Sequence, residues 1–595
     1  MSDKFKNLFP QTRRQFLTAS TLSTVSLSML SCSDTSTGNN SDAGVDADGD
    51  IHDGDIHDAD IHDADIDGDG GDDSISPPPE RPPTTVTVTV TGVLAATEQF
   101  EDLRHAFGKV EEGFGESHQL RNDLNAASVA NGSTVSPSSL AYFCHMTDIH
   151  VVDEESPARS IHSPIAEASA WRPQECWSTH VLNGAIKTIN QFAAVHPMDF
   201  IVFSGDLIDN KQNNEIQWFV DVLEGKLIDP DTGLDDDPLA PGLPDPHDPF
   251  QSDGLDPAVD WYAVQGNHDL LVLGNFDVMD FAVADPTGDS ATFYISDYAQ
   301  PTCLSEPPCP ESYCYSDTPG RCNVPASDNY FDSSYAPPDA DRYFTDRTEW
   351  IQRVMDADSN GPLGHGFSQA NLDNNLSYWR VDEPVPGIPV AMLGLDTSSA
   401  GGVTATATGY ISDDELQWLE DQLNDLVSLN KLVIIVSHHC SRDLGSKTDE
   451  FRNILNSCPN VVLHITGHHH QNEVMPRPAP SGMEPWYGYY EVQNCGLLDW
   501  PQQIRFWEIT DNGDGTGIIY STMVDIQMES GSVIEAARFY ALLDVQEART
   551  QGGAGDLEDR NVAFQVAWPP EMLSILANLP AREVETFHFM PEKKS

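Results

Sequence analysis

The stretch Phe200-Ile-Val-Phe-Ser-Gly-Asp-Leu-Ile-Asp209 joins four apolar residues to a turn that carries two carboxylates. Short runs rich in β-branched and aromatic residues, bounded by turn residues, are typical of buried strands. Four more runs have this form, and each also stops at polar side chains: residues 140–144, 261–264, 432–436 and 461–463. We therefore predict five buried strands, each followed by groups that could do chemistry.

Helical patterns lie between these strands. One apolar stripe at helical spacing comprises Val181, Leu182, Ala185, Ile186 and Ile189, and a second comprises Leu416, Leu419 and Leu423. Ser412 and Glu415 precede the second stripe and predict a capping box at the start of a helix. Residues 491–494 and 507–510 predict further strands. Alternation of strands and helices predicts an α/β fold, in which ligands bind beyond the carboxyl ends of the strands.

The polar side chains that follow the strands are of metal-ligating types. They are Asp148, His150, Asp206, Asn267, His438, His468 and His470. Carboxylate, imidazole and amide-oxygen donors suit divalent ions such as Mn, Fe, Zn or Ni. Two such ions about 3.5–4 Å apart can clamp the attacking and leaving oxygens of a phosphoryl transfer. The pattern therefore indicates a phosphoesterase with two divalent metal ions per chain.

The order of these motifs resembles that of the calcineurin-like metallophosphoesterase superfamily: D-x-H, G-D-x-x-D, G-N-H-[DE], a lone H, and G-H-x-H. The resemblance covers roughly residues 140–526. It implies a four-layer sandwich of two mixed β-sheets flanked by helices. It also implies that metal-activated hydroxide attacks the phosphoester, with Asp206 bridging the two ions and His268 contacting the phosphate as a possible proton donor. Asp206 and His268 are therefore the expected catalytic residues.

The resemblance implies a ligand set for each ion. One ion is expected on Asp148, His150, Asp206 and His470, and the other on Asp206, Asn267, His438 and His468. The fourth motif departs from the common form H-H-P, because Cys440 stands in place of the proline. His438 or His439 could be the ligand there. We favour His438, which directly follows the strand and its first small residue. Asp209 is expected to accept a hydrogen bond from a ligand and orient it.

Composition narrows the function. The chain has 595 residues and a formal net charge of −65, which argues against nucleic acid as a partner because phosphates would be repelled. We expect a phosphoester substrate, most simply a phosphodiester. A phosphomonoesterase is the alternative enzyme, and a non-catalytic metal-binding surface lipoprotein is the alternative of another class. The sequence leaves the substrate and the oligomeric state open.

The N-terminus predicts export. Residues 12–17 contain Arg13 and Arg14 and resemble the twin-arginine export motif, and residues 22–30 form an apolar segment too short to span a membrane. Cys32 follows in a context that resembles a lipobox, so residues 1–32 are interpreted as a lipoprotein-type signal. The alternative is a cleaved signal with an incidental cysteine. We expect the periplasm, or the outer membrane or cell surface with a lipid anchor at Cys32.

The remaining segments are assigned by composition and position. Residues 33–83 are predicted to be a disordered Asp-rich tether, 84–530 the catalytic domain, and 531–595 a helical extension. Residues 270–389 are predicted to be an insertion that acts as a cap over the site, and His365 within it could touch substrate. Arg159 and Arg172 in the loop 151–178 are weaker candidates for phosphate contact. Four clustered cysteines favour disulfides, and Cys144 is expected to be a buried free thiol: the cluster is Cys303, Cys309, Cys314 and Cys322.

Overall fold

We describe the protein from a computed structural model. It describes residues 115–132, 136–156, 172–232, 246–275, 292–294, 330–332, 338–358, 361–400, 404–527, 533–546 and 552–585. The predicted signal, the tether, Arg159 and the cysteine cluster at 303–322 lie outside these ranges. Within them, no helix is both long enough and apolar enough to cross a bilayer.

Two large mixed sheets form the centre of the molecule. The first has seven strands in the order β1 (Gln119–Arg121), β19 (Val562–Ala567), β18 (Thr516–Asp525), β17 (Gln503–Asp511), β2 (Ser138–Met146), β3 (Phe200–Phe203) and β6 (Asp260–Ala263). The second has six strands in the order β15 (Glu473–Arg477), β16 (Tyr489–Gln493), β14 (Val461–Thr466), β13 (Leu432–Val436), β10 (Val390–Gly394) and β9 (Trp379–Val381). All five strands predicted from the apolar runs are present.

The described part also contains three small strand pairs, eight α-helices and several short 3-10 helices. The pairs are β4 (Leu227–Ile228) with β5 (Phe250–Gln251), β7 (Thr292–Tyr294) with β8 (Tyr330–Asp332), and β11 (Ser399–Ala400) with β12 (Thr404–Ala405). The helices are α3 (Ser178–Val195), α4 (Asn213–Leu223), α5 (Arg347–Met355), α6 (Gln369–Asn374), α7 (Asp413–Ser428), α8 (Thr448–Ser457), α9 (Val533–Gln546) and α10 (Pro570–Leu576).

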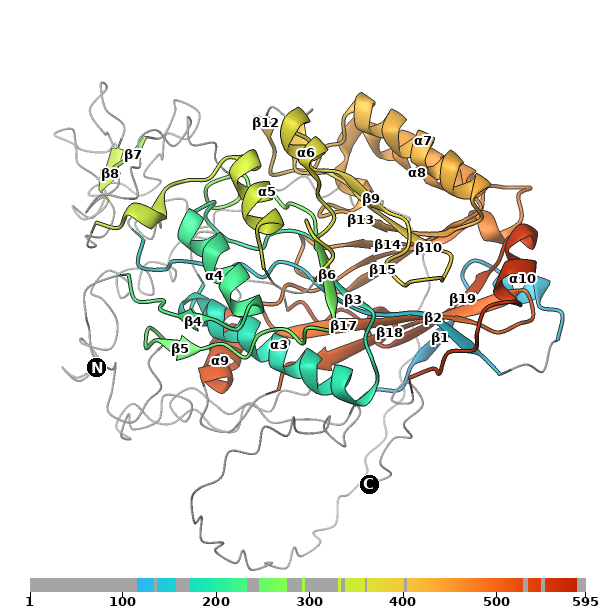
Figure 1. The fold of residues 1–595 in the computed structure, drawn as a ribbon, viewed down its shortest axis with the longest axis horizontal. Helices are drawn as coiled ribbons and strands as arrows, with labels where there is room; N and C mark the ends of the chain where they lie inside the picture. The colour runs from blue at the N-terminus through green and yellow to red at the C-terminus, as the bar shows by residue number, and fades with distance from the viewer. Residues whose placement is uncertain are drawn as a thin grey trace, which may run out of the picture.

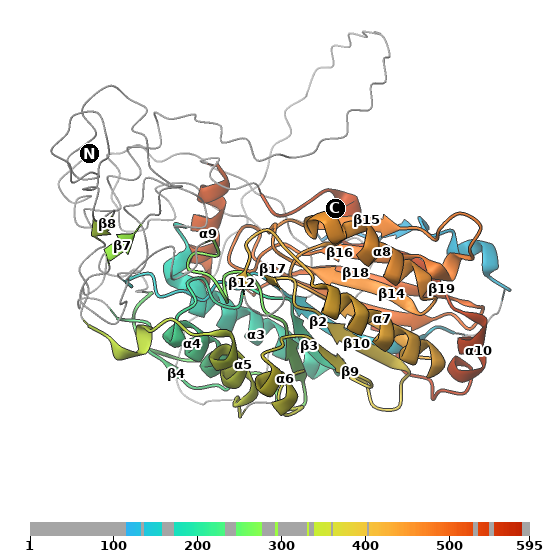
Figure 2. The ribbon, with the colours of Figure 1, turned by 90° about the horizontal axis from the view of Figure 1, so that it is seen from above.

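The sheets and helices stack in four layers, as predicted. Helices α3 and α4 lie on the side of the seven-stranded sheet, and α7 and α8 lie on the side of the six-stranded sheet (Figures 1 and 2). Alternation along β13 shows how one strand serves two layers, because successive side chains point to opposite faces. Ile434 and Val436 belong to the core shared with the seven-stranded sheet, whereas Val433 and Ile435 pack in the cluster that contains α7 and α8.

Strand register places the predicted motifs at one edge of both sheets. In the first sheet the strand-end residues Met146, Phe203 and Ala263 are direct neighbours across the parallel strands β2, β3 and β6. In the second, Val436 of β13 pairs with Ile465 of β14, so the loops that follow also lie together. Carboxyl ends of parallel strands meet at one edge, and the five motif loops leave from that edge.

Local structure differs from the sequence expectation at the α7 cap. Ser412 accepts a hydrogen bond from the backbone N–H of Glu415 at 3.1 Å, as a capping box requires. The Glu415 carboxylate, however, accepts from the backbone N–H of Asp396 at 2.7 Å. Only half of the predicted capping box therefore forms, because Glu415 is recruited to tie the helix to the loop after β10.

Two core strands lie in segments that the sequence analysis assigned elsewhere. β9 falls inside the stretch predicted as an insertion, and it is the edge strand of the six-stranded sheet, paired antiparallel with β10. β19 falls inside the predicted helical extension, between α9 and α10, and it pairs with β18 and β1. Both are short runs whose strand character depends on a neighbouring strand. The described parts of these two segments therefore contribute to the core.

Candidate metal centre

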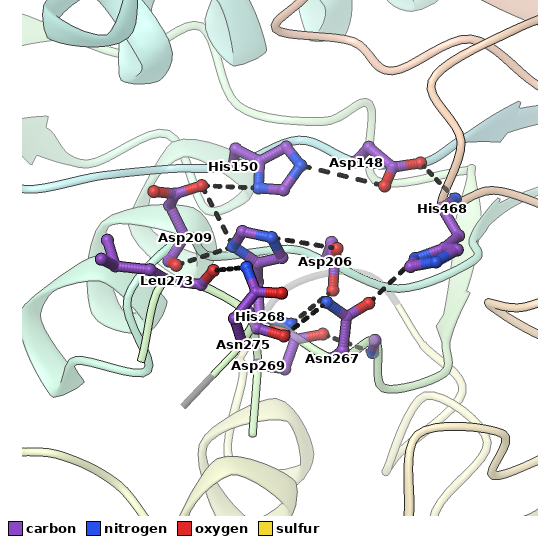
Figure 3. Close-up of polar contacts among 12 residues, drawn as sticks. Asp148, His150, Asp206, Asp209, Asn267, His268, Asp269, Leu273, Asn275 and His468 are labelled. Atoms are coloured by element: carbon purple, nitrogen blue, oxygen red, sulfur yellow. Dashed lines mark hydrogen bonds and ion pairs between the residues drawn. The ribbon is translucent and has the colours of Figure 1, made fainter. Parts of the chain in front are cut away.

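The structure brings the seven predicted ligands together in two neighbouring groups. In the first, His470 Nε2 lies 3.1 Å from Asp148 Oδ1 and 3.1 Å from His150 Nε2. In the second, His438 Nε2 lies 3.1 Å from Asp206 Oδ2 and 3.0 Å from Asn267 Oδ1, and His468 Nδ1 lies 3.1 Å from that same amide oxygen. The groups touch where His438 Nε2 comes within 4.0 Å of Asp148 Oδ1. Figure 3 shows several of these side chains converging from different loops.

The atoms around Nδ1 of two predicted ligand histidines indicate which ring nitrogen carries the proton. His150 Nδ1 lies 2.8 Å from Asp209 Oδ1, and His470 Nδ1 lies 2.5 Å from Asp499 Oδ2. His438 Nδ1 lies 2.9 Å from the backbone oxygen of Ser204. An N–H on Nδ1 of His438 or His470 directed at its oxygen leaves Nε2 as an acceptor, which is how ligating histidines are usually oriented. His150 Nδ1 lies close to Asp209 without hydrogen-bond geometry.

Atoms that can ligate a metal therefore converge at this edge of the sheets. The Nε2 atoms of His150 and His470 face each other, and the buried Asp148 Oδ1 beside them has no hydrogen-bond partner among the described residues. Buried acceptors crowded in this way are unfavourable unless a cation or protons neutralise them. Two carboxylates, an amide oxygen and four imidazoles fit a pair of hard-to-borderline divalent ions.

The pKa values of two histidines show that carboxylates are crowded together in the metal-free chain. Burial opposes protonation of His438, but the Asp206 carboxylate outweighs it and raises the pKa of His438 to about 9. Burial is likewise outweighed at His470, whose pKa is raised to about 10 by Asp148 and Asp499. Without cations the site thus attracts protons to the nitrogens that face its carboxylates.

Five of the seven predicted ligands have an unusual backbone conformation. Asp148, His150, Asp206, His468 and His470 all have positive φ, between 49° and 76°. Non-glycine residues rarely adopt this left-handed region, and each such residue costs about 1–3 kcal/mol unless its surroundings impose it. Five strained residues among seven predicted ligands indicate that the loops are shaped to direct these side chains inward.

Two glycines of the motifs allow the loops to approach closely. A Cβ at Gly205, which has φ +99°, would lie 2.7 Å from His438 Nδ1. A Cβ at Gly467 would lie 1.9 Å from Thr147 Oγ1 and 2.5 Å from Asp148 Oδ2. Glycine at these positions is therefore required for contact between loops that come from different strands.

The geometry favours His438 over His439 as the ligand in the fourth motif. His438 Nε2 contacts both Asp206 and Asn267. His439 turns toward Thr397, whose hydroxyl lies 3.2 Å from Nδ1, and its ring packs beside that of His468 with centroids 4.2 Å apart. His439 is close to the second group but does not face its carboxylate.

His268 lies at the margin of both groups. Its Nδ1 lies 2.9 Å from the backbone oxygen of Asp209, and its Nε2 lies 4.0 Å from Asp206 Oδ2. Burial lowers the pKa of His268, but the carboxylates of Asp206 and Asp209 outweigh burial and raise it overall. The ring is thus held by the backbone and presents Nε2 toward the side of Asp206.

A charged network behind the first group was only partly predicted. Asp209 orients His150, as expected. Asp499, which carried no recognised motif, does the same for His470. Arg172 lies between these carboxylates, with Nη1 2.9 Å from Asp209 Oδ1 and Nε 3.3 Å from Asp499 Oδ1. Its guanidinium is buried and forms ion pairs with both carboxylates, and a phosphate contact by Arg172 stays a prediction.

His365 is also placed differently from expectation. From the sequence, His365 was a candidate for contact with substrate. The ring is buried and stacks on Trp261, with centroids 3.6 Å apart and planes 13° apart. Its Nδ1 lies 3.1 Å from the backbone oxygen of Trp261. His365 is therefore a buried residue that packs on Trp261 of β6.

Arg172→Gln is expected to weaken cation binding by roughly 10–100-fold, the usual effect of losing a group that orients metal ligands. The loss should fall mainly on the ion expected at His150 and His470, because Arg172 forms ion pairs with the two carboxylates beside these histidines. Bound metal after dialysis at fixed free metal concentrations measures the effect. Arg380→Gln, which removes a surface ion pair with Asp382, is the control. Equal metal retention in both variants would contradict the assignment.

Comparison with known proteins gives low-level structural similarity only. No family model and no curated protein matches the chain. Among solved structures, a dimetal phosphatase from Danio rerio is similar at 12% identity and a TM-score of 0.33, over 65% of this chain and 100% of that chain. Sulfate thiohydrolase SoxB from Thermus thermophilus is similar at 8% identity and 0.27, over 70% and 62% of the respective chains. A purple acid phosphatase from yellow lupin is similar at 9% identity and 0.27, over 74% and 55%.

Proposed function

We propose that this protein is a metal-dependent phosphoesterase that hydrolyses phosphodiesters. One observation carries the proposal: ligand atoms of seven side chains, five of them buried, converge at the carboxyl-end edge of two sheets, and the Nε2 atoms of His438 and His268 lie 3.1 Å and 4.0 Å from Asp206 Oδ2. A purely structural polar cluster would pair each acceptor with a donor. Here the Nδ1 atoms of His438, His150 and His470 lie beside Ser204, Asp209 and Asp499, and their Nε2 atoms face the other proposed ligands.

The chain's own residues would hold and orient the reacting groups. Asp148, His150 and His470 would hold one ion, Asn267, His438 and His468 the other, and Asp206 would contact both. Bound there, two divalent ions would lower the pKa of a water molecule and neutralise charge on the phosphoryl oxygens. His268 would donate a proton to the departing oxygen, with its ring fixed by the Asp209 backbone.

Residues 552–585 pack against the rest of the described domain. They add β19 to the seven-stranded sheet, and the backbone oxygen of Gly553 accepts a hydrogen bond from Asn472 N–H at 2.8 Å. They therefore support the ligand loop that ends at His470.

The test is turnover of matched substrates by the protein reconstituted with Mn²⁺, Zn²⁺, Fe²⁺ or Ni²⁺. Bis(nitrophenyl) phosphate is expected to be hydrolysed faster than nitrophenyl phosphate, and a chelator should abolish both activities. A reversed preference would establish the phosphomonoesterase alternative. Stoichiometric binding of two ions without turnover of any phosphoester in a broad panel would establish the non-catalytic alternative.

We also propose that the protein is exported and anchored to a membrane through Cys32. Support comes from the order of twin arginine, apolar segment, cysteine and Asp-rich spacer in residues 12–83. Cys32→Ala is expected to move the protein from the membrane fraction to the soluble exported fraction, and Arg13→Lys with Arg14→Lys to retain it in the cytoplasm. Immunoblots of cell fractions measure both effects. An unchanged membrane fraction in the Cys32 variant would disprove the anchor.

A further inference from the structure

A second set of metal-ligating side chains lies beside the centre, on its outer side. Cys440 Sγ and His469 Nε2 each lie 2.9 Å from the same oxygen, Asp443 Oδ2. The three ligand atoms lie within 4.8 Å of one another. None of these residues belongs to the seven ligands proposed above.

The metal-binding motifs described above do not require Cys440 or His469. Cys440 stands where the common H-H-P motif has proline, and His469 occupies the variable position of G-H-x-H. His469 lies between His468 and His470 in the loop after β14, and its side chain is 38% exposed. The fold thus brings together a thiol and an imidazole that the motif pattern does not require.

Donor type distinguishes this set from the centre. Thiolate, imidazole and carboxylate together are ligands of borderline ions such as Zn²⁺, which commonly takes three protein ligands and a water molecule. Cys440 is fully buried, Asp443 is partly exposed and His469 is exposed, so one side of the set faces solvent. Arg442, the nearby cation, makes its ion pair with Glu473 at 2.6 Å.

We propose that Cys440, Asp443 and His469 form a third, peripheral binding site for a borderline divalent cation, Zn²⁺ by preference. On binding, the thiol proton of Cys440 passes to solvent, and His469 binds as the neutral ring through Nε2 with its proton on Nδ1. Asp443 binds as the carboxylate that it already is, and solvent supplies the fourth ligand. The site would link the loop after β13 to the loop after β14, which carry His438, His468 and His470.

Cobalt(II) is the probe, because cobalt bound to thiolate absorbs in the near ultraviolet and cobalt bound only to oxygen and nitrogen does not. Titration of the intact exported protein, freed of metal without reduction of any disulfides, should saturate at three ions per chain and develop this band. Cys440→Ser should saturate at two ions without the band. Zn²⁺ added to the cobalt-loaded wild type should remove the band.

Three further variants make the outcome decisive. Cys458→Ser removes a buried thiol at the end of α8, away from the proposed site, and should keep the band. His469→Gln changes an exposed side chain, so it should fold normally and weaken the cobalt affinity of the site at least tenfold. Asp206→Asn should lose ions of the centre and keep the band, which separates this site from the proposed function.

The proposal is overturned if wild type shows no thiolate band, or if the band persists in Cys440→Ser. It is also overturned if His469→Gln binds cobalt at the thiolate site as tightly as wild type. None of these readouts depends on turnover of a phosphoester.

Discussion

Asp206→Asn is expected to leave the protein folded while it loses bound metal and catalytic activity together. Asp206 is fully buried, its Oδ2 lies 3.1 Å from His438 Nε2, and its Oδ1 accepts the backbone N–H of His268 at 2.8 Å. Asparagine has nearly the same shape and can keep the backbone hydrogen bond. It removes the negative charge from the one residue expected to contact both ions.

The expected loss of activity exceeds about 10²-fold, the upper range for residues that merely orient a ligand. Metal analysis of dialysed protein and turnover of bis(nitrophenyl) phosphate measure the two effects in one preparation. Asp260→Asn, at the opposite end of β6 from Asn267, is the matched control and should change neither. Full activity in Asp206→Asn would mean that the reaction occurs elsewhere in the protein.

His268→Ala is expected to separate metal binding from catalysis. The ring is fixed by the Asp209 backbone at 2.9 Å, and its Nε2 is 4.0 Å from Asp206 Oδ2, farther than the 3.1 Å of His438. Both ions should therefore remain bound. Turnover should fall by roughly 10²–10⁴-fold, the usual contribution of a positioned proton donor.

Leaving-group dependence distinguishes proton donation from a general structural effect. The loss should be small for a nitrophenyl ester, whose leaving group departs without a proton, and large for an alkyl ester. Comparing kcat for the two ester types in His268→Ala and His268→Gln, alongside bound metal, provides the measurement. If His268→Ala lost metal as fully as Asp206→Asn, His268 would be a ligand in the group it forms with His150 and Asp209.

Strands with strong local patterns were predictable from the sequence, and weakly patterned ones were not. The runs at 200–203 and 432–436 coincide with β3 and β13, because buried β-branched and aromatic residues favour strands wherever they pack. β19 lies between helical segments, and its strand character comes from pairing with β18 and β1. β9 similarly depends on β10. β9 is an edge strand and β19 lies between β1 and β18, and a single sequence does not show which strands pair with each other.

The least predictable residues were those that contact the predicted ligands on the side facing away from the centre. Asp209 could be expected because it belongs to a motif, whereas Asp499 lies 29 positions from the histidine that it orients. Arg172 and His365 look like available polar groups in the sequence. The structure places Arg172 between two buried carboxylates and His365 on the face of Trp261. Such roles depend on loop packing, which leaves no periodic signal.

The sequence by itself determined the kind of fold and the set of candidate ligands, because strand patterning and motif residues are local properties of the chain. The tertiary structure decided which atoms face each other. Only the packed loops direct His438 Nε2 toward Asp206 and turn His439 toward Thr397. Only they bring Cys440, Asp443 and His469 together on the outer side. These pairings depend on side-chain direction and on positive-φ turns, which long-range packing imposes and neighbouring residues in the sequence do not.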